Sequence, residues 1–132
     1  MPIQDKEVTD IIIKTFYQVY NELGYGFLEK VYHNALLFAL NKKGLYCESR
    51  KKLIVYFETV QVGEYYPDLI VNESVILELK ASEALSYENE CQLINYLRAT
   101  DIEIGLLLNF GRKPEFRRKY FTNDRKKIRV YP

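Results

Sequence analysis

Apolar and polar positions along the chain predict two helices, a strand-rich middle, and then a third helix with a final strand. Between residue 5 and about residue 22 apolar side chains recur at helical spacing, and Gly24 stands where a C-cap would lie. A second helix is predicted from about residue 28 to residue 43, with Gly44 after it. Its expected buried stripe consists of Leu28, Val31, Ala35, Leu36, Ala39 and Leu40.

The middle of the chain changes to β-branched and aromatic residues, which are typical of strands. Strands are predicted to begin around Tyr46 and to continue through residues 52–59 and 60–66, followed by residues 68–71 and 75–81. The turn-forming residues 72–74 separate the last two segments, so we expect these two strands to be antiparallel neighbours.

A third helix is predicted from about residue 87 to residue 99, with Ser86 as its N-cap and Cys91, Ile94 and Leu97, or a similar stripe, as its buried side. The nearly continuous apolar run at 103–110 predicts a strand covered on both faces, and residues 127–131 could add a short closing strand. These elements predict a mixed α/β fold in which helices flank a central mixed β-sheet. The expected order is α-α-β-β-β-β-α-β.

Composition is that of an ordinary globular domain, with 132 residues of which 48% are hydrophobic and 28% charged. We therefore expect residues 1–132 to form one domain. Cys47 and Cys91 are far apart and lack CxxC spacing, which excludes a zinc or iron–sulfur site. No apolar run approaches the roughly 18 residues of a membrane span, so a cytoplasmic protein with no membrane partner is expected.

Charge is unevenly distributed, because residues 111–132 hold nine Lys or Arg against two acidic residues, a net of +7. The preceding 110 residues carry a net of −6. A basic segment beside an acidic body is what a phosphate-binding surface next to a cation site would look like. The alternative is a solvated terminal helix or hairpin.

Three charged residues stand where apolar strand residues would be expected. Asp68 opens one strand of the predicted hairpin, and Glu78 and Lys80 lie two positions apart in the other, so they share a face. A three-residue turn would place Asp68 opposite Glu78, whereas a two-residue turn would place it opposite Leu77. We expect the three-residue turn. Two converging carboxylates would then form a site for Mg²⁺ or Mn²⁺ beside a lysine, although an edge-strand charge network is the structural alternative.

The segment Gly26-Phe27-Leu28-Glu29-Lys30-Val31-Tyr32 matches the motif of the GxxExxY protein family, which resembles the PD-(D/E)XK nuclease superfamily. The resemblance runs from the first helix through Phe110 and includes Pro67-Asp68, Glu78-x-Lys80 and Gln92-x-x-x-Tyr96. It implies a restriction-endonuclease-like core. The chain departs from the family pattern at Tyr66, where arginine is common, and at Asn89, where histidine is frequent.

The resemblance implies a role for each matching residue. Glu29, Asp68 and Glu78 resemble the metal ligands, and Lys80 resembles the catalytic lysine. Gln92 and Tyr96 lie on one helical face and are similar to a glutamine–tyrosine pair that contacts the active site or the nucleic acid in RecB-like nucleases. Tyr32 is expected to be a core aromatic that anchors Glu29, and His33, the only histidine, is expected to lie beside the site or on the surface.

The sequence thus predicts an Mg²⁺-dependent nuclease acting on DNA, with RNA as the second option, through a metal-activated water. The basic tail would bind the phosphate backbone through Arg112, Lys113, Arg117 and Arg118. A second basic cluster is formed in the sequence by Lys42, Lys43, Arg50, Lys51 and Lys52. The alternative function is a non-catalytic nucleic-acid-binding or protein-interaction module that retains the nuclease fold. The small size suggests a homodimer or a subunit of a larger complex.

Overall fold

The computed structural model describes residues 2–127, with side chains from residue 5 onward. Two helices come first, α1 (Pro2–Leu23) and α2 (Glu29–Lys42). Five strands follow them: β1 (Cys47–Ser49), β2 (Leu53–Phe57), β3 (Val60–Tyr65), β4 (Leu69–Val71) and β5 (Val75–Lys80). The chain continues with α3 (Tyr87–Arg98), β6 (Ile104–Phe110), β7 (Pro114–Tyr120) and the 3₁₀ turn η1 (Asn123–Arg125).

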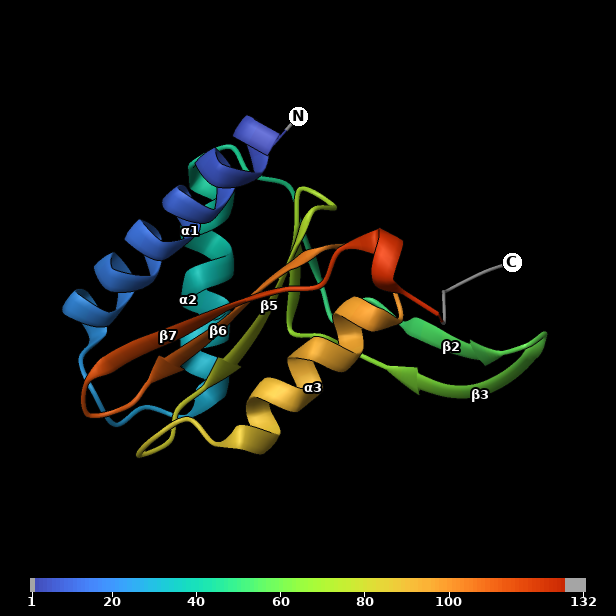
Figure 1. Cartoon of the computed structure of the whole chain (residues 1–132). Helices are drawn as coiled ribbons and strands as arrows, with labels where there is room; N and C mark the ends of the chain where they lie inside the picture. The colour runs from blue at the N-terminus through green and yellow to red at the C-terminus, as the bar shows by residue number, and fades with distance from the viewer. Residues whose placement is uncertain (1, 128–132) are drawn as a thin grey trace.

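A five-stranded mixed sheet in the order β1-β4-β5-β6-β7 forms the centre of the fold. Strands β5 and β6 are parallel because α3 crosses over between them, and every other neighbouring pair is antiparallel. Helices α1 and α2 cover one face of this sheet and α3 covers the other (Figure 1). The predicted mixed sheet flanked by helices is therefore confirmed.

Two apolar cores lie on the two faces of the sheet. Because successive side chains of a strand point to opposite faces, the central strands contribute side chains to both cores. Leu77 and Leu79 of β5 point into the core beneath α1 and α2, whereas Ile76 points into the core beneath α3. In β6, Leu108 and Leu107 are divided in the same way. Each fully buried side chain of this size stabilises the fold by about 1.5–3 kcal/mol. The prediction that the apolar run at 103–110 forms a strand covered on both faces is thus confirmed.

The helices lie close to their predicted ranges, but the buried face of α2 differs from the predicted stripe. Tyr32, Leu36 and Leu40 are the buried residues of α2. Leu28, expected to be buried, is 79% exposed, and Val31 is also exposed. Leu28 precedes the first helical turn, and the aromatic ring of Tyr32 fills the core position that Val31 was expected to take. Residues Leu93, Tyr96 and Leu97 form the buried side of α3, so Cys91 and Ile94 are only partly buried.

Strands β2 and β3 leave the main sheet and form a separate two-stranded ribbon that projects from the body (Figure 1). Leu53 at its base is buried, but five of the six residues of β3 are exposed. A period-two pattern cannot distinguish such a ribbon from strands of the central sheet, and we did not expect the separation.

The end of the chain adds an element that the sequence pattern did not predict. Strand β7 pairs along the whole of β6, so the basic segment begins with a strand of the main sheet. The predicted closing strand at residues 127–131 falls almost entirely outside the described residues. Within residues 2–127, no helix combines the length and the apolar character that a membrane crossing needs.

Candidate active site

The register of the β4–β5 hairpin brings the two predicted acids face to face. Val71 pairs with Val75, and Leu69 pairs with Leu77, so three residues form the turn. Asn72 and Glu73 in this turn have φ values of 51° and 55°, the left-handed conformation that closes tight hairpins. One further step along the ladder places Asp68 opposite Glu78. The predicted three-residue turn, and with it the shared face of the two acids, is confirmed.

Each acid is held by the backbone of the opposite strand. The backbone N–H of Asp68 donates to Oε2 of Glu78 at 2.9 Å, and the backbone N–H of Leu79 donates to Oδ2 of Asp68 at 2.8 Å. Pro67 precedes Asp68 and has no N–H to continue the ladder. Where regular pairing ends, the two carboxylates therefore accept the backbone hydrogen bonds in place of carbonyl groups. These two reciprocal bonds fix the orientation of both carboxylates.

Glu78 is buried in an environment that disfavours its negative charge. The residue is 5% exposed, and burial raises its pKa to about 8. The negative charge of Asp68 adds to the rise, whereas the Asp68 N–H and the Lys80 ammonium oppose it. Two carboxylates are therefore held together with too little positive charge to balance them. A divalent cation would relieve this imbalance.

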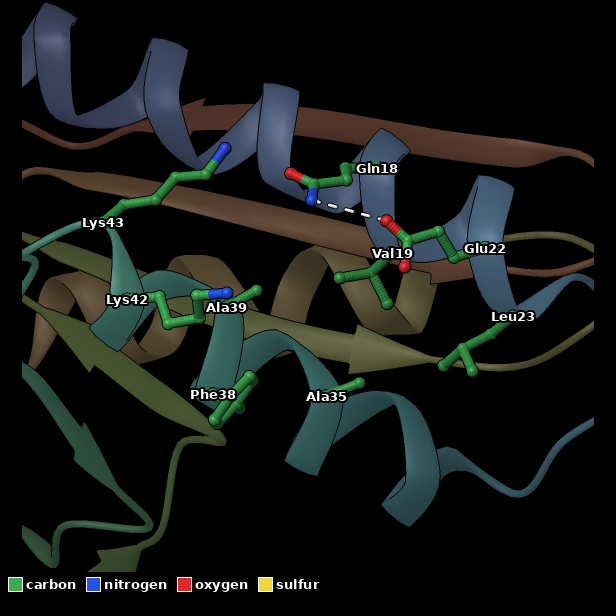
Figure 2. A pocket seen from close by; sticks show the side chains of 9 residues that line it. All are labelled: Gln18, Val19, Glu22, Leu23, Ala35, Phe38, Ala39, Lys42 and Lys43. Atoms are coloured by element: carbon green, nitrogen blue, oxygen red, sulfur yellow. Dashed lines mark hydrogen bonds between the residues drawn. The ribbon is translucent and has the colours of Figure 1, made fainter.

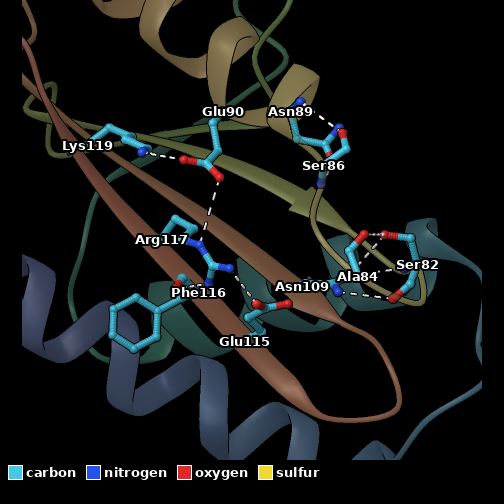
Figure 3. Close-up of polar contacts among 10 residues, drawn as sticks. All are labelled: Ser82, Ala84, Ser86, Asn89, Glu90, Asn109, Glu115, Phe116, Arg117 and Lys119. Atoms are coloured by element: carbon cyan, nitrogen blue, oxygen red, sulfur yellow. Dashed lines mark hydrogen bonds and ion pairs between the residues drawn. The ribbon is translucent and has the colours of Figure 1, made fainter.

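Lys80 shares the α3 face of β5 with Glu78, because Leu77 and Leu79 point into the opposite core. It is partly buried, and its charge reaches both Glu78 and Glu29. The backbone just after Lys80 is clamped by the buried side chain of Asn109, which accepts from the Ser82 N–H and donates to the Ser82 carbonyl, both at 3.0 Å (Figure 3). This clamp was not expected, since its partners lie 27 residues apart in the sequence.

Glu29 lies in the first turn of α2, and Tyr32 fixes the loop that leads into it. The Tyr32 hydroxyl donates to the Gly24 carbonyl at 2.6 Å and accepts from the Phe27 N–H at 3.2 Å. Its ring stacks on Phe110 at 4.4 Å between centroids. The expected role of Tyr32 as a core aromatic is confirmed. Burial raises the pKa of Glu29, Lys80 lowers it, and Asp68 raises it, so Glu29 lies within electrostatic reach of the acid pair.

The three predicted metal ligands do not form a closed cluster. Among the described residues, no group of three or more His, Cys, Asp or Glu side chains is close enough to hold one ion. Asp68 and Glu78 are brought together by their hydrogen bonds, and Glu29 lies within electrostatic reach of them without completing such a group. Mg²⁺ keeps several water ligands and is commonly bound through one or two carboxylates, so the pair fits this ion without a third protein ligand.

A cleft of about 410 Å³ opens beside the acids, between the start of α2 and the end of β1. Its lining includes Glu29, Asp68, His33 and Arg50. His33 Nε2 lies 2.9 Å from Ser49 Oγ in this cleft, and burial lowers the pKa of this histidine. Arg50 Nη1 lies 3.5 Å from Asp68 Oδ1. Arg50 was not predicted as part of the site, because it is 18 residues from Asp68 in the sequence.

Gln92 and Tyr96 share one face of α3, as predicted. The Gln92 side-chain amide donates to the Tyr96 hydroxyl at 3.0 Å, and the Tyr96 ring lies 5.4 Å from the ring of Tyr65. Burial raises the pKa of Tyr96, and the charges of Glu78 and Asp68 add to the rise. The pair therefore lies beside the acids, with Gln92 exposed and Tyr96 buried.

Within residues 111–127, the part of the basic tail that the structure describes, the cationic side chains do not form a single face. Arg112 and Lys113 lie in the turn after β6, at the same end of the sheet as Lys80, and Arg112 is 3.2 Å from Glu83. Arg117 and Arg118 are adjacent in β7 and so point to opposite faces of the sheet. On the α3 face, Arg117 pairs with Glu115 at 2.7 Å, and Glu90 contacts both Arg117 and Lys119 (Figure 3).

The second basic cluster seen in the sequence is also divided in space. Lys42 and Lys43 line a hollow of about 390 Å³ between α1 and α2, together with the exposed ring of Phe38 (Figure 2). Helix α2 has 14 residues and is therefore about 20 Å long, which separates Lys42 from Glu29 at its other end. Only Arg50 of this cluster lines the cleft beside Asp68.

Most of the chain matches the model of a known protein superfamily. Residues 6–119 match the family model described as the PD-(D/E)XK nuclease superfamily. Neither the comparison with curated proteins nor the comparison with solved structures finds a match. Membership of the GxxExxY branch stays a prediction. Because the match covers most of the chain and agrees with its mixed α/β fold, the chain belongs to the PD-(D/E)XK nuclease superfamily.

Proposed function

We propose that this protein is an Mg²⁺-dependent nuclease that hydrolyses phosphodiester bonds of DNA, with RNA as the second option. The observation that carries the proposal is the acid pair of the buried Glu78 and the partly buried Asp68. Asp68 and Glu78 converge with backbone-fixed orientations, and Lys80 stands on the same face of β5 as Glu78. Membership of the superfamily supports a nuclease-type function.

In this proposal Asp68 and Glu78 would hold the cation, and Glu29, which lines the same cleft as Asp68, would be the third acid beside it. When bound, Mg²⁺ lowers the pKa of a coordinated water and offsets negative charge on the phosphate. The chain's own contribution is positioning. The reciprocal hydrogen bonds of the acid pair hold it in place, and the Asn109 clamp fixes the backbone that follows Lys80. The Lys80 ammonium orients the attacking water and stabilises charge that develops on the phosphate.

Substrate binding in this proposal uses two sides of the acid pair. Gln92 and Tyr96 flank it on α3, and Arg112 and Lys113 lie at the same end of the sheet as Lys80. Arg117 and Arg118 contribute less to binding than the sequence suggested, because Arg117 is already paired with acids and Arg118 points to the other face.

The test is cleavage of single-stranded DNA, double-stranded DNA and RNA by the purified chain with Mg²⁺, Mn²⁺ or EDTA. We expect metal-dependent cleavage that is lost in EDTA and reduced at least 100-fold in Lys80→Ala. Lys14→Ala is the matched control, because Lys14 is an exposed lysine on α1, and it should cleave like the parent. Nucleic-acid binding without cleavage under every condition would overturn the proposal in favour of a binding module.

A further inference from the structure

Arg50 has a backbone conformation that an arginine rarely adopts. Its φ is 54°, in the left-handed region, which is unfavourable for a residue with a Cβ. Its backbone N–H donates to the Asp68 carbonyl at 3.2 Å. The same residue thus meets Asp68 twice, through its main chain and through the guanidinium at 3.5 Å. The unfavourable backbone places the side chain against one acid of the pair.

The guanidinium faces the Asp68 oxygen that the backbone leaves available. Oδ2 of Asp68 accepts from the Leu79 N–H, and Oδ1 is the atom near Arg50. A cation held by Asp68 would bind Oδ1 in preference, because Oδ2 already uses one of its lone pairs on the Leu79 N–H. Arg50 and a divalent cation therefore compete for Oδ1 of Asp68.

The Arg50 side chain has room to move away from Asp68. Its side chain is 63% exposed and lines the 410 Å³ cleft, so it can leave Asp68 without a rearrangement of the backbone. The cleft offers further donors in Lys30, His33, Asn34 and Ser49. The carboxylates of Glu29 and Asp68 line the side of this cleft where the cation would lie, and the donors beside Arg50 match a phosphate group, which arginine binds with two parallel hydrogen bonds.

We propose that Arg50 is a phosphate-binding residue whose release is coupled to the metal. In the metal-free protein the guanidinium rests on Asp68. A divalent cation displaces it, and the freed guanidinium binds a backbone phosphate of the nucleic acid in the cleft beside the acids. This inference rests on the proposed metal-dependent nuclease. It makes cation binding and nucleic-acid binding mutually reinforcing, since each favours the position of Arg50 that the other requires.

Removing the side chain should therefore change two affinities in opposite directions. Without nucleic acid, Arg50→Ala should bind Mn²⁺ about 3- to 10-fold more tightly, because a partly exposed competitor of this kind is worth about 1 kcal/mol. With Mn²⁺ present, the same variant should bind nucleic acid about 10-fold more weakly. Without Mn²⁺ the loss should be less than about 2-fold, because Arg50 then remains on Asp68.

The experiment measures Mn²⁺ binding by calorimetry and the binding of a fluorescent oligonucleotide by anisotropy. A Lys80→Ala background prevents cleavage during the binding measurement. Lys51→Ala is the matched control, because Lys51 is the next basic residue and pairs with Glu48 at 3.5 Å outside the cleft. Arg50→Lys keeps the charge without the paired donors, and we expect it to recover the Mn²⁺ affinity of the parent but not its oligonucleotide affinity.

The outcomes separate this inference from the proposed function. Unchanged or weaker Mn²⁺ binding in Arg50→Ala would overturn the role of Arg50, even if the parent is an active nuclease. An equal loss of oligonucleotide binding with and without Mn²⁺ would also overturn that role, as would a Lys51→Ala variant that behaves like Arg50→Ala. If both opposite shifts are found and the parent chain, with Lys80 intact, cleaves no substrate, the coupling stands and the nuclease proposal fails.

Discussion

Replacing Glu78 by glutamine should stabilise the metal-free protein at alkaline pH. The pKa of Glu78 is raised to about 8 in the folded protein, against 4.5 for an ordinary glutamate. Between these two values the folded state keeps a proton that the unfolded state releases, so the free energy of unfolding falls as pH rises through this window. Glutamine has nearly the same shape but cannot ionise, so Glu78→Gln should lose this fall.

The size of the effect follows from the two pKa values. One unit of pKa difference is worth about 1.4 kcal/mol, so a rise from 4.5 to about 8 sets a ceiling of about 5 kcal/mol. Water entry and small side-chain shifts reduce that ceiling, because they let the charged form escape part of the burial. We expect the stability of the parent to fall about 2–3 kcal/mol further than that of Glu78→Gln between pH 5 and pH 9.

Urea denaturation in EDTA at pH 5, 7 and 9 measures this difference directly. Glu7→Gln is the control, because Glu7 is exposed on α1 and should follow the parent at every pH. Addition of Mg²⁺ at pH 8 should raise the stability of the parent and leave Glu78→Gln nearly unchanged, since the cation balances the charge of the acid pair. Stability curves for the parent and Glu78→Gln that run parallel from pH 5 to pH 9 would refute the reasoning.

Three further substitutions test how the site is supported. Tyr32→Phe removes the hydroxyl that donates to Gly24, so it should lower stability by about 1–3 kcal/mol in urea denaturation; no measurable loss would show that this bond is not needed. Gly111→Ala should lower the free energy of unfolding by at least about 2 kcal/mol and reduce cleavage, because a Cβ there would lie 2.3 Å from the Ser82 carbonyl oxygen. A variant with the melting temperature and cleavage rate of the parent would show that the Ser82 loop shifts to accept the Cβ. Glu73→Gly should raise the free energy of unfolding by about 0.5–1 kcal/mol, because the φ of 55° at this position suits glycine. The melting temperature should therefore rise slightly, and a lower melting temperature would contradict this.

What the sequence could predict was local. Alternation reduced the register of the β4–β5 hairpin to two options, and the choice of a three-residue turn aligned Asp68 with Glu78, as the structure has it. Ser86 was predicted as the N-cap of α3, and its side chain accepts from the Asn89 N–H at that position. Helix ranges and the doubly covered strand β6 followed from periodicity.

Contacts between distant segments were not predictable from such patterns. Arg50 reaches Asp68, and Asn109 clamps Ser82, only because separate strands meet at one end of the sheet. The detachment of the β2–β3 ribbon and the pairing of β7 with β6 depend on which strand edges remain free, and a period-two pattern does not record that. The approach of Glu29 to the cleft that Asp68 lines depends likewise on how α2 packs against the sheet.

The acid pair is aligned by a hairpin but buried by other elements, and this difference has a consequence for folding kinetics. Asp68 and Glu78 are ten residues apart and are aligned by a hairpin, a local contact of the kind that forms early. Their burial requires α3 and the parallel β5–β6 pairing, which closes a longer loop and comes later. A cation that compensates this burial acts after the hairpin has formed. It should therefore leave the folding rate nearly constant and appear as slower unfolding, so that the metal prolongs the lifetime of the folded chain.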